Sequence, residues 1–143
     1  MNKLGGFMAA KKKLSQKNMK LGLLSNRDFV DIFNKLYESA LPVKASYLLL
    51  IIKDEIKKHS EYYELMRQKL IIKHGETNED GTIKMNEEKT QFLMKDLEAF
   101  NVDFKALGEI EVPITKIPIS ELGNCQFTPI QLSILLSSIV EDS

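Results

Sequence analysis

An apolar row runs through the middle of the chain and recurs at alternating spacings of four and three residues for nearly four heptads. This spacing places the row on one side of an α-helix, so the sequence predicts a helix from Val43 to Lys73. At ~1.5 Å per residue such a helix is about 45 Å long, and it needs a partner helix from the same chain or another copy because an isolated helix is marginal in water. The row consists of Ala45, Leu49, Ile52, Ile56, His59, Tyr63, Met66 and Leu70.

The same chain offers a partner helix after a polar loop at residues 75–85. Asn86 is a capping residue followed by two acidic residues, and apolar side chains then recur at helical spacing through Leu93, Leu97 and Phe100. We therefore expect an antiparallel helical hairpin whose return helix begins at Asn86 and is about half as long as the first helix. A second apolar row widens the predicted buried face of the first helix and consists of Leu48, Ile51, Tyr62 and Leu65.

Two shorter helices flank this hairpin. Ser25 is a capping residue with an acidic residue three positions later, which predicts a helix that begins near Asn26 and ends before Pro42. Near the C-terminus, the pair Thr128-Pro129 combines a capping residue with a proline at the first helical position, and apolar residues follow. The sequence therefore predicts a final helix close to the end of the chain.

Short strands are expected between the hairpin and the final helix. Apolar residues recur at a spacing of two from residue 110 to residue 119, with one break in register. Pro113 and Pro118 lack the N–H that a sheet requires, so these strands should lie at an edge or have a bulge there, with residues 19–24 as a candidate partner. The sequence predicts a mostly helical α+β fold, in which a long antiparallel helical hairpin stands on a small head with short edge strands and a C-terminal helix.

The charges of the chain balance, but they are unevenly distributed. Twenty basic and twenty acidic residues give a formal net charge of zero, so the whole chain exerts no long-range attraction on nucleic acid or a membrane surface. Residues 1–25 nevertheless hold six lysines and no acidic residue. We expect residues 1–18 to form a flexible basic arm and residues 19–143 to form a single domain built around the hairpin. No apolar run reaches the ~18 residues of a membrane span, so we expect no membrane partner.

Few residues in the sequence are suited to catalysis or metal binding. One cysteine, Cys125, excludes an internal disulfide framework, and two histidines leave too few ligands for a transition-metal site. We interpret His59 as a packed histidine with one hydrogen-bonded nitrogen, and His74 as a cation at a helix end, followed by a capping Gly75. The chain has no glycine-rich phosphate loop and no nucleophile motif. These features predict a protein that is not an enzyme and that needs no cofactor.

The loop of the predicted hairpin contains a pattern close to a twelve-residue calcium loop. Its residues occupy positions 1, 3, 5, 6, 8 and 12 of that motif, and they are Glu76, Asn78, Asp80, Gly81, Ile83 and Glu87. The first position requires the short side chain of Asp, whereas this chain has Glu, and no second loop completes a pair. An ordinary polar turn is therefore the preferred interpretation, and a single calcium site built on Glu76, Asn78, Asp80 and Glu87 is the alternative.

Several short segments carry a resemblance to a known family. They are Leu-Pro-Val-Lys-Ala-Ser-Tyr at 41–47, Arg-Gln-Lys-Leu-Ile-Ile-Lys-His-Gly-Glu at 67–76, Asn-Glu-Asp-Gly at 78–81, Glu-Ile-Glu-Val at 109–112 and Thr-Pro at 128–129. Over roughly residues 19–140 the chain resembles a family of small uncharacterised proteins encoded by phages and prophages of Gram-positive bacteria. The resemblance implies a phage accessory protein that works by binding, either as a virion component or assembly factor or as an inhibitor of a host or defence machine. It implies a location in the bacterial host cytoplasm or the virion, and no catalytic residues.

The expected function is therefore protein binding without catalysis, with a phage or host protein, or a second copy, as the partner. We expect part of the long helix to extend beyond its shorter return helix and to offer the partner the side chains of Tyr62, Tyr63, Met66 and Leu70. The arm would contribute Lys11, Lys12 and Lys13. Nucleic-acid binding through the same basic arm is the main alternative, and calcium binding by the loop is a further one.

Overall fold

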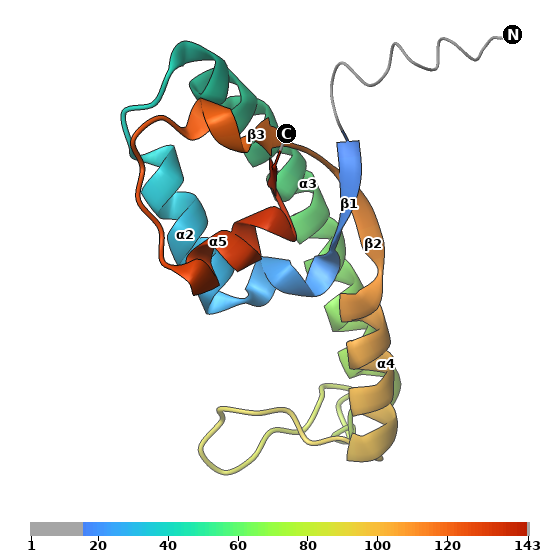
Figure 1. The fold of residues 1–143 in the computed structure, drawn as a ribbon. Helices are drawn as coiled ribbons and strands as arrows, with labels where there is room; N and C mark the ends of the chain where they lie inside the picture. Colours follow the sequence, from blue (N-terminus) through green and yellow to red (C-terminus); the bar gives the residue numbers. More distant parts are fainter. Residues whose placement is uncertain (1–15, 143) are drawn as a thin grey trace, which may run out of the picture.

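The computed structural model describes residues 16–142. It confirms the mostly helical α+β class: a long helical hairpin projects from a small head that also contains two short sheets (Figure 1). Lys11, Lys12 and Lys13 lie outside the described residues. The elements in chain order are β1 (Gln16–Lys20), the 3-10 helix η2 (Leu21–Ser25), α2 (Arg27–Tyr37), α3 (Val43–His74), α4 (Leu97–Glu109), β2 (Glu111–Thr115), β3 (Ile117–Pro118), the 3-10 helix η3 (Ile119–Leu122), α5 (Pro129–Leu136) and β4 (Val140–Glu141).

Helix α3 forms as the apolar row predicts and extends one residue further, to His74. Its N-terminal half packs against the head, and its C-terminal half packs against α4 (Figure 1). Gly75 ends the helix in an extended conformation. A Cβ atom at this position would lie 2.6 Å from the carbonyl oxygen of Ile71 and 2.7 Å from Cγ2 of Ile83, so glycine is needed here for close packing and not for a left-handed backbone.

The head is held together by one apolar core. Helix α2 contributes one side of this core through Phe29, Phe33 and Leu36, and the N-terminal half of α3 contributes another. Strands and the C-terminal segment close the remaining sides (Figure 1). The fully buried members include Met19, Leu36, Ile52, Ile114, Ile117, Leu135 and Ile139.

Helix α2 lies close to its predicted position, but its cap is one residue later than expected. The side-chain oxygen of Asn26 accepts a hydrogen bond from the backbone N–H of Phe29 at 3.0 Å. Ser25 instead donates its hydroxyl hydrogen to the carbonyl oxygen of Gly22. The sequence-based choice of Ser25 was wrong because residues 21–25 already form a 3-10 turn, which occupies that hydroxyl.

The predicted edge strands are present in two sheets of two strands each. Strand β1 pairs antiparallel with β2, with Met19 opposite Val112 and Asn18 opposite Pro113. The expected partner segment at 19–24 is shifted toward the N-terminus, because the chain turns into η2 at Leu21. Consequently the expected boundary between arm and domain at residue 18 falls inside β1. Strand β3 pairs parallel with β4, which ties the C-terminal segment to the head.

The return helix is the largest departure from the sequence analysis. Helix α4 begins at Leu97, and its cap is Asp96, ten positions after the predicted cap. Asp96 accepts a hydrogen bond from the backbone N–H of Ala99. The side chain of Asn86 accepts instead from the backbone N–H groups of Thr90 and Gln91, so it closes a turn and starts no helix. Residues 75–96 form an irregular excursion, with isolated antiparallel bridges at Gly75↔Met94, Thr77↔Ile83 and Met85↔Phe92.

Helix α5 forms where the Thr128-Pro129 signal predicts. Thr128 and Gln131 make a reciprocal capping box, in which each side chain accepts a hydrogen bond from the backbone N–H of the other residue. Within the part of the chain that is described, no helix combines the length and the apolar character that crossing a membrane would require.

Candidate partner-binding surface

The four hairpin residues predicted to face a partner divide into one exposed and three covered side chains. Tyr62 is about half exposed, whereas Tyr63 is only 8% exposed and belongs to a second core cluster with Leu21 and Leu107. Met66 and Leu70 are half-buried and pack against the same cluster. The prediction for Tyr63 was therefore wrong, and Met66 and Leu70 face the return helix in place of open solvent.

The physical reason for this correction is the position of α4. The predicted return helix begins too early in the chain, and Tyr63 was expected to lie beyond the part of α3 that this helix covers. In the structure α4 runs on to Glu109, and Phe104 and Leu107 lie against Tyr63, with the Tyr63 and Phe104 rings 6.2 Å apart between centroids. The side of α3 that carries Tyr63 therefore packs against the antiparallel α4 and forms the core of the hairpin.

The free end of the hairpin is fastened by a polar cluster. The Nε2–H of His74 donates to Oδ2 of Asp103 at 2.7 Å, and the Nζ of Lys73 lies 3.2 Å from the same oxygen. The ring of Phe100 meets the His74 ring edge to face. The hydrogen bonds from His74 and Lys73 lower the pKa of Asp103 below its ordinary value. This cluster joins the last turn of α3 to α4. His74 lies in that last turn, at the helix end where the sequence places it.

The excursion at residues 75–96 contains a tight turn where the calcium loop was considered. Oδ1 of Asp80 accepts from both the backbone N–H and the hydroxyl of Thr82, and Asn78 donates its amide to the same hydroxyl. Gly81 has a φ of +90°, which suits glycine in such a turn. These bonds make the ordinary turn that the sequence analysis preferred.

The arrangement differs from a helix–loop–helix calcium site in two respects. The second helix begins at Leu97, so Glu87 lies in the excursion and not in the first turn of a helix. Among residues 16–142, no group of three or more His, Cys, Asp or Glu side chains is placed to hold a metal ion. The pattern formed by Glu76, Asn78, Asp80 and Glu87 therefore lacks the geometry that made the calcium alternative reasonable.

A groove lies where the excursion folds back against the two helices. It consists of two adjoining hollows of about 640 and 280 Å³ that share Arg67, Ile71 and Phe92 in their walls. The smaller hollow is also lined by Ile72 and Ile83, and the larger one by Met94, Leu97 and Phe100. Apolar side chains from α3, α4 and the excursion therefore meet along one groove.

The rim of this groove has little net charge. Arg67 donates two hydrogen bonds to the carboxylate of Glu64, at 3.0 Å from Nε and 2.9 Å from Nη2. Gln68 donates a third to the same carboxylate. The hydrogen bond from Arg67 lowers the pKa of Glu64, so this carboxylate stays ionised and offsets the guanidinium. The smaller hollow thus offers a partner mainly apolar contacts, whereas the larger one also presents the polar side chains of Thr90, Gln91 and Asn101.

Large apolar side chains are exposed around the groove. Ile72 is 67% exposed and Leu97 is 60% exposed, although they lie on different helices. The excursion adds Phe92, which lines both hollows, and two further partly exposed residues, Met85 and Leu93, which line neither. We call these five residues the tip patch. A gathering of exposed apolar side chains beside a groove is typical of interaction surfaces, whereas scattered exposed residues are ordinary.

The tip patch could not be recognised from the predicted elements, because part of it was assigned to the wrong one. Leu93 and Leu97 were placed on one predicted helix, where they would have been buried against α3. The available signal was the apolar run Phe92-Leu93-Met94 within an otherwise polar stretch. Such a run in a turn-rich segment is typical of a buried strand or of an exposed contact surface. The helical spacing of the neighbouring apolar residues favoured a helix instead.

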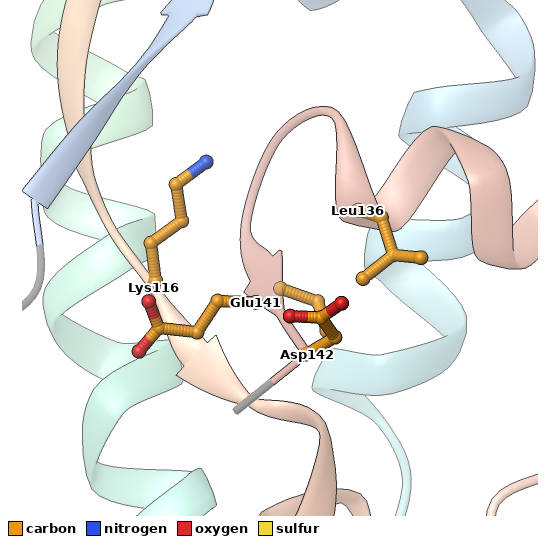
Figure 2. A pocket seen from close by; sticks show the side chains of 5 residues that line it. Lys116, Leu136, Glu141 and Asp142 are labelled. Atoms are coloured by element: carbon orange, nitrogen blue, oxygen red, sulfur yellow. The ribbon is translucent and has the colours of Figure 1, made fainter.

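Another hollow, of about 170 Å³, lies beside the C-terminal strand and is lined by charged side chains (Figure 2). Lys116 is buried, and its Nζ donates to the carbonyl oxygen of Ser138. Figure 2 shows this nitrogen pointing away from the carboxylates of Glu141 and Asp142. The lysine thereby fastens the turn between α5 and β4, which is a structural role.

The remaining candidate residues also have structural roles. Nε2–H of His59 donates to the carbonyl oxygen of Pro113 at 2.9 Å, which confirms the prediction of a packed histidine with one hydrogen-bonded nitrogen. Cys125 is half-buried and packs against the core of the head.

Comparisons with known proteins add no assignment to this picture: no family model, no curated protein and no solved structure matches the chain. The function must accordingly be inferred from the surface of the molecule.

Proposed function

We propose that this chain is a non-catalytic protein-binding protein whose partner contacts the groove and tip patch at the free end of the hairpin. The observation that carries this proposal is the exposure of large apolar side chains from three separate segments around one groove. Leaving such side chains in water is unfavourable, and a partner protein that covers them gains the free energy of their burial.

The location of this surface supports the same function. The hairpin projects from the head, so its free end is accessible to a large partner without disturbance of the head core (Figure 1). The polar cluster of Lys73, His74 and Asp103 holds the two helix ends together. A surface held in place in advance binds with a smaller loss of conformational entropy than a mobile one.

The more specific role is that of a phage accessory protein, either a virion component or assembly factor or an inhibitor of a host or defence machine. It is supported by the resemblance of the short segments described above. In that role the partner is a phage or host protein, and the chain acts in the bacterial cytoplasm or in the particle.

The experiment is capture of binding proteins from a nuclease-treated bacterial lysate by the tagged full chain, followed by mass spectrometry. The test variant combines Ile72→Lys and Leu97→Asp, because a cation suits the last turn of α3 and an acidic residue suits the first turn of α4. The matched control is Ile130→Glu, since Ile130 is 71% exposed but lies on α5.

We expect the wild-type chain and the control to retain the same stoichiometric protein, and the double variant to lose it at least ~10-fold. Retention of that protein by the double variant, with an unchanged circular dichroism spectrum, would show that the tip patch is not the binding surface. Capture of a protein from untreated lysate but not from nuclease-treated lysate would favour the nucleic-acid alternative.

A further inference from the structure

Helix α3 carries a further row of side chains on the side away from the buried row. Tyr62 and Leu65 of this row were predicted to widen the buried face, but both are exposed. The row follows spacings of four, three, four, four and three residues, which keeps its members on one side of the helix. Its three largest apolar members, Tyr47, Tyr62 and Leu65, are all more than half exposed. The complete row, which we call the outer seam, is Tyr47, Ile51, Asp54, Lys58, Tyr62 and Leu65.

The outer seam is self-complementary about its middle. Tyr47 and Leu65 lie nine residues before and after Ile56, and Asp54 and Lys58 lie two residues before and after it. Ile51 and Tyr62 lie five residues before and six residues after the same position. An antiparallel second copy of this helix would therefore place an apolar side chain opposite each apolar one and a lysine opposite each aspartate.

We propose that a second copy of this chain binds along the outer seam, with the two α3 helices antiparallel and related by a two-fold axis at the level of Ile56. Tyr47 of each copy then packs on Leu65 of the other, and Ile51 packs beside Tyr62. Asp54 of each copy lies across from Lys58 of the other. Both ends of the seam are apolar and its centre is charged, so the same arrangement that permits association also fixes its direction.

The charged centre is available for such contacts. Within residues 16–142, neither Asp54 nor Lys58 takes part in an ion pair, and both are exposed. A parallel pairing would place Asp54 beside Asp54 and Lys58 beside Lys58, which repels. Since the outer seam lies on the side of α3 away from the buried row, pairing there leaves both cores intact. This inference does not depend on the function proposed for the tip patch.

The test uses charge reversal in the full chain, measured by sedimentation equilibrium at ~0.05 M salt, where screening is weak. Asp54→Lys places two lysines across from two lysines in the dimer, and Lys58→Asp places two aspartates across from two aspartates. We expect the wild type to dimerise, and each single variant to dimerise roughly tenfold more weakly. The control Ile130→Glu should leave the dissociation constant unchanged.

Mixing the two variants provides the decisive measurement. In a dimer of one Asp54→Lys chain with one Lys58→Asp chain, every charged contact across the seam is again between opposite charges. The mixture should therefore associate more tightly than either variant alone. If each substitution weakened association only by disturbing its own chain, mixing the two variants would not restore it.

A wild-type chain that stays monomeric at ~100 µM would overturn the proposal. A dimer whose dissociation constant is indifferent to both charge reversals, or a mixture no tighter than the separate variants, would also overturn it. Circular dichroism of each variant verifies that the helices are retained.

Discussion

The head and the hairpin share helix α3 but are stabilised to very different extents. Among the described residues, the head core contains fifteen buried side chains drawn from most elements of the chain, whereas the hairpin cluster contains three, Leu21, Tyr63 and Leu107. Burial of apolar surface is the main source of folding free energy. The head therefore supplies most of the stability. The hairpin has few buried side chains of its own and leaves large apolar side chains exposed.

This division suits a binding protein. Elements with few buried contacts open locally at a lower free energy than a core does, so we expect the hairpin to open at a lower free energy than the head. The exposed residues of the tip patch lie in this less stable region. Three substitutions test whether the head and the hairpin differ in stability.

The strongest test is a cavity in the head. Ile52 is fully buried on α3, and Ile52→Ala removes apolar volume at the centre of that core. We expect a loss of about 3 kcal/mol in the free energy of unfolding, because the surrounding side chains close such a cavity only in part. Urea denaturation followed by circular dichroism measures this change. A loss below ~1 kcal/mol would mean that the head is not the stabilising region.

A smaller effect is expected from the matching change in the hairpin. Leu107→Ala also removes a buried side chain, but the pocket it leaves is bordered by fewer neighbours. We expect a cost of about 2 kcal/mol, confined to the hairpin. Hydrogen exchange followed by mass spectrometry should show faster exchange over residues 97–109 and unchanged exchange over α2. Equal acceleration in both regions would show that the head and the hairpin open as one unit.

The smallest effect concerns the polar cluster at the free end and depends on pH. The pKa of Asp103 is lowered in the folded chain by hydrogen bonds from His74 and Lys73. Its contribution to stability is therefore fully present above the ordinary pKa of 3.8 and is lost as pH falls through the lowered folded value. We expect Asp103→Asn to accelerate hydrogen exchange at the tip at neutral pH and to have no such effect at strongly acidic pH. An equal effect of the substitution at both pH values would contradict this role of the ionised carboxylate.

Local sequence signals were sufficient for several parts of this fold. The four-and-three spacing determined the long helix, because only a helix places such a row on one side. Thr128 and Pro129 determined the start of α5, and the prolines at 113 and 118 confined their segments to edge strands. In each case the deciding interaction lies within a few residues of the signal.

The candidate site depended on interactions between distant residues. Asn86 carries a good cap signal, yet its side chain closes a turn because the excursion pairs Met85 with Phe92. That pairing delays α4 to Leu97, which brings Leu107 over Tyr63 and leaves Leu97 exposed at the tip. The sequence by itself therefore determined the long helix, the C-terminal helix and the short strands at 111–118. Only the tertiary structure decided which apolar side chains are covered, because burial depends on where a second segment comes to lie, and spacing along one segment carries no information about that.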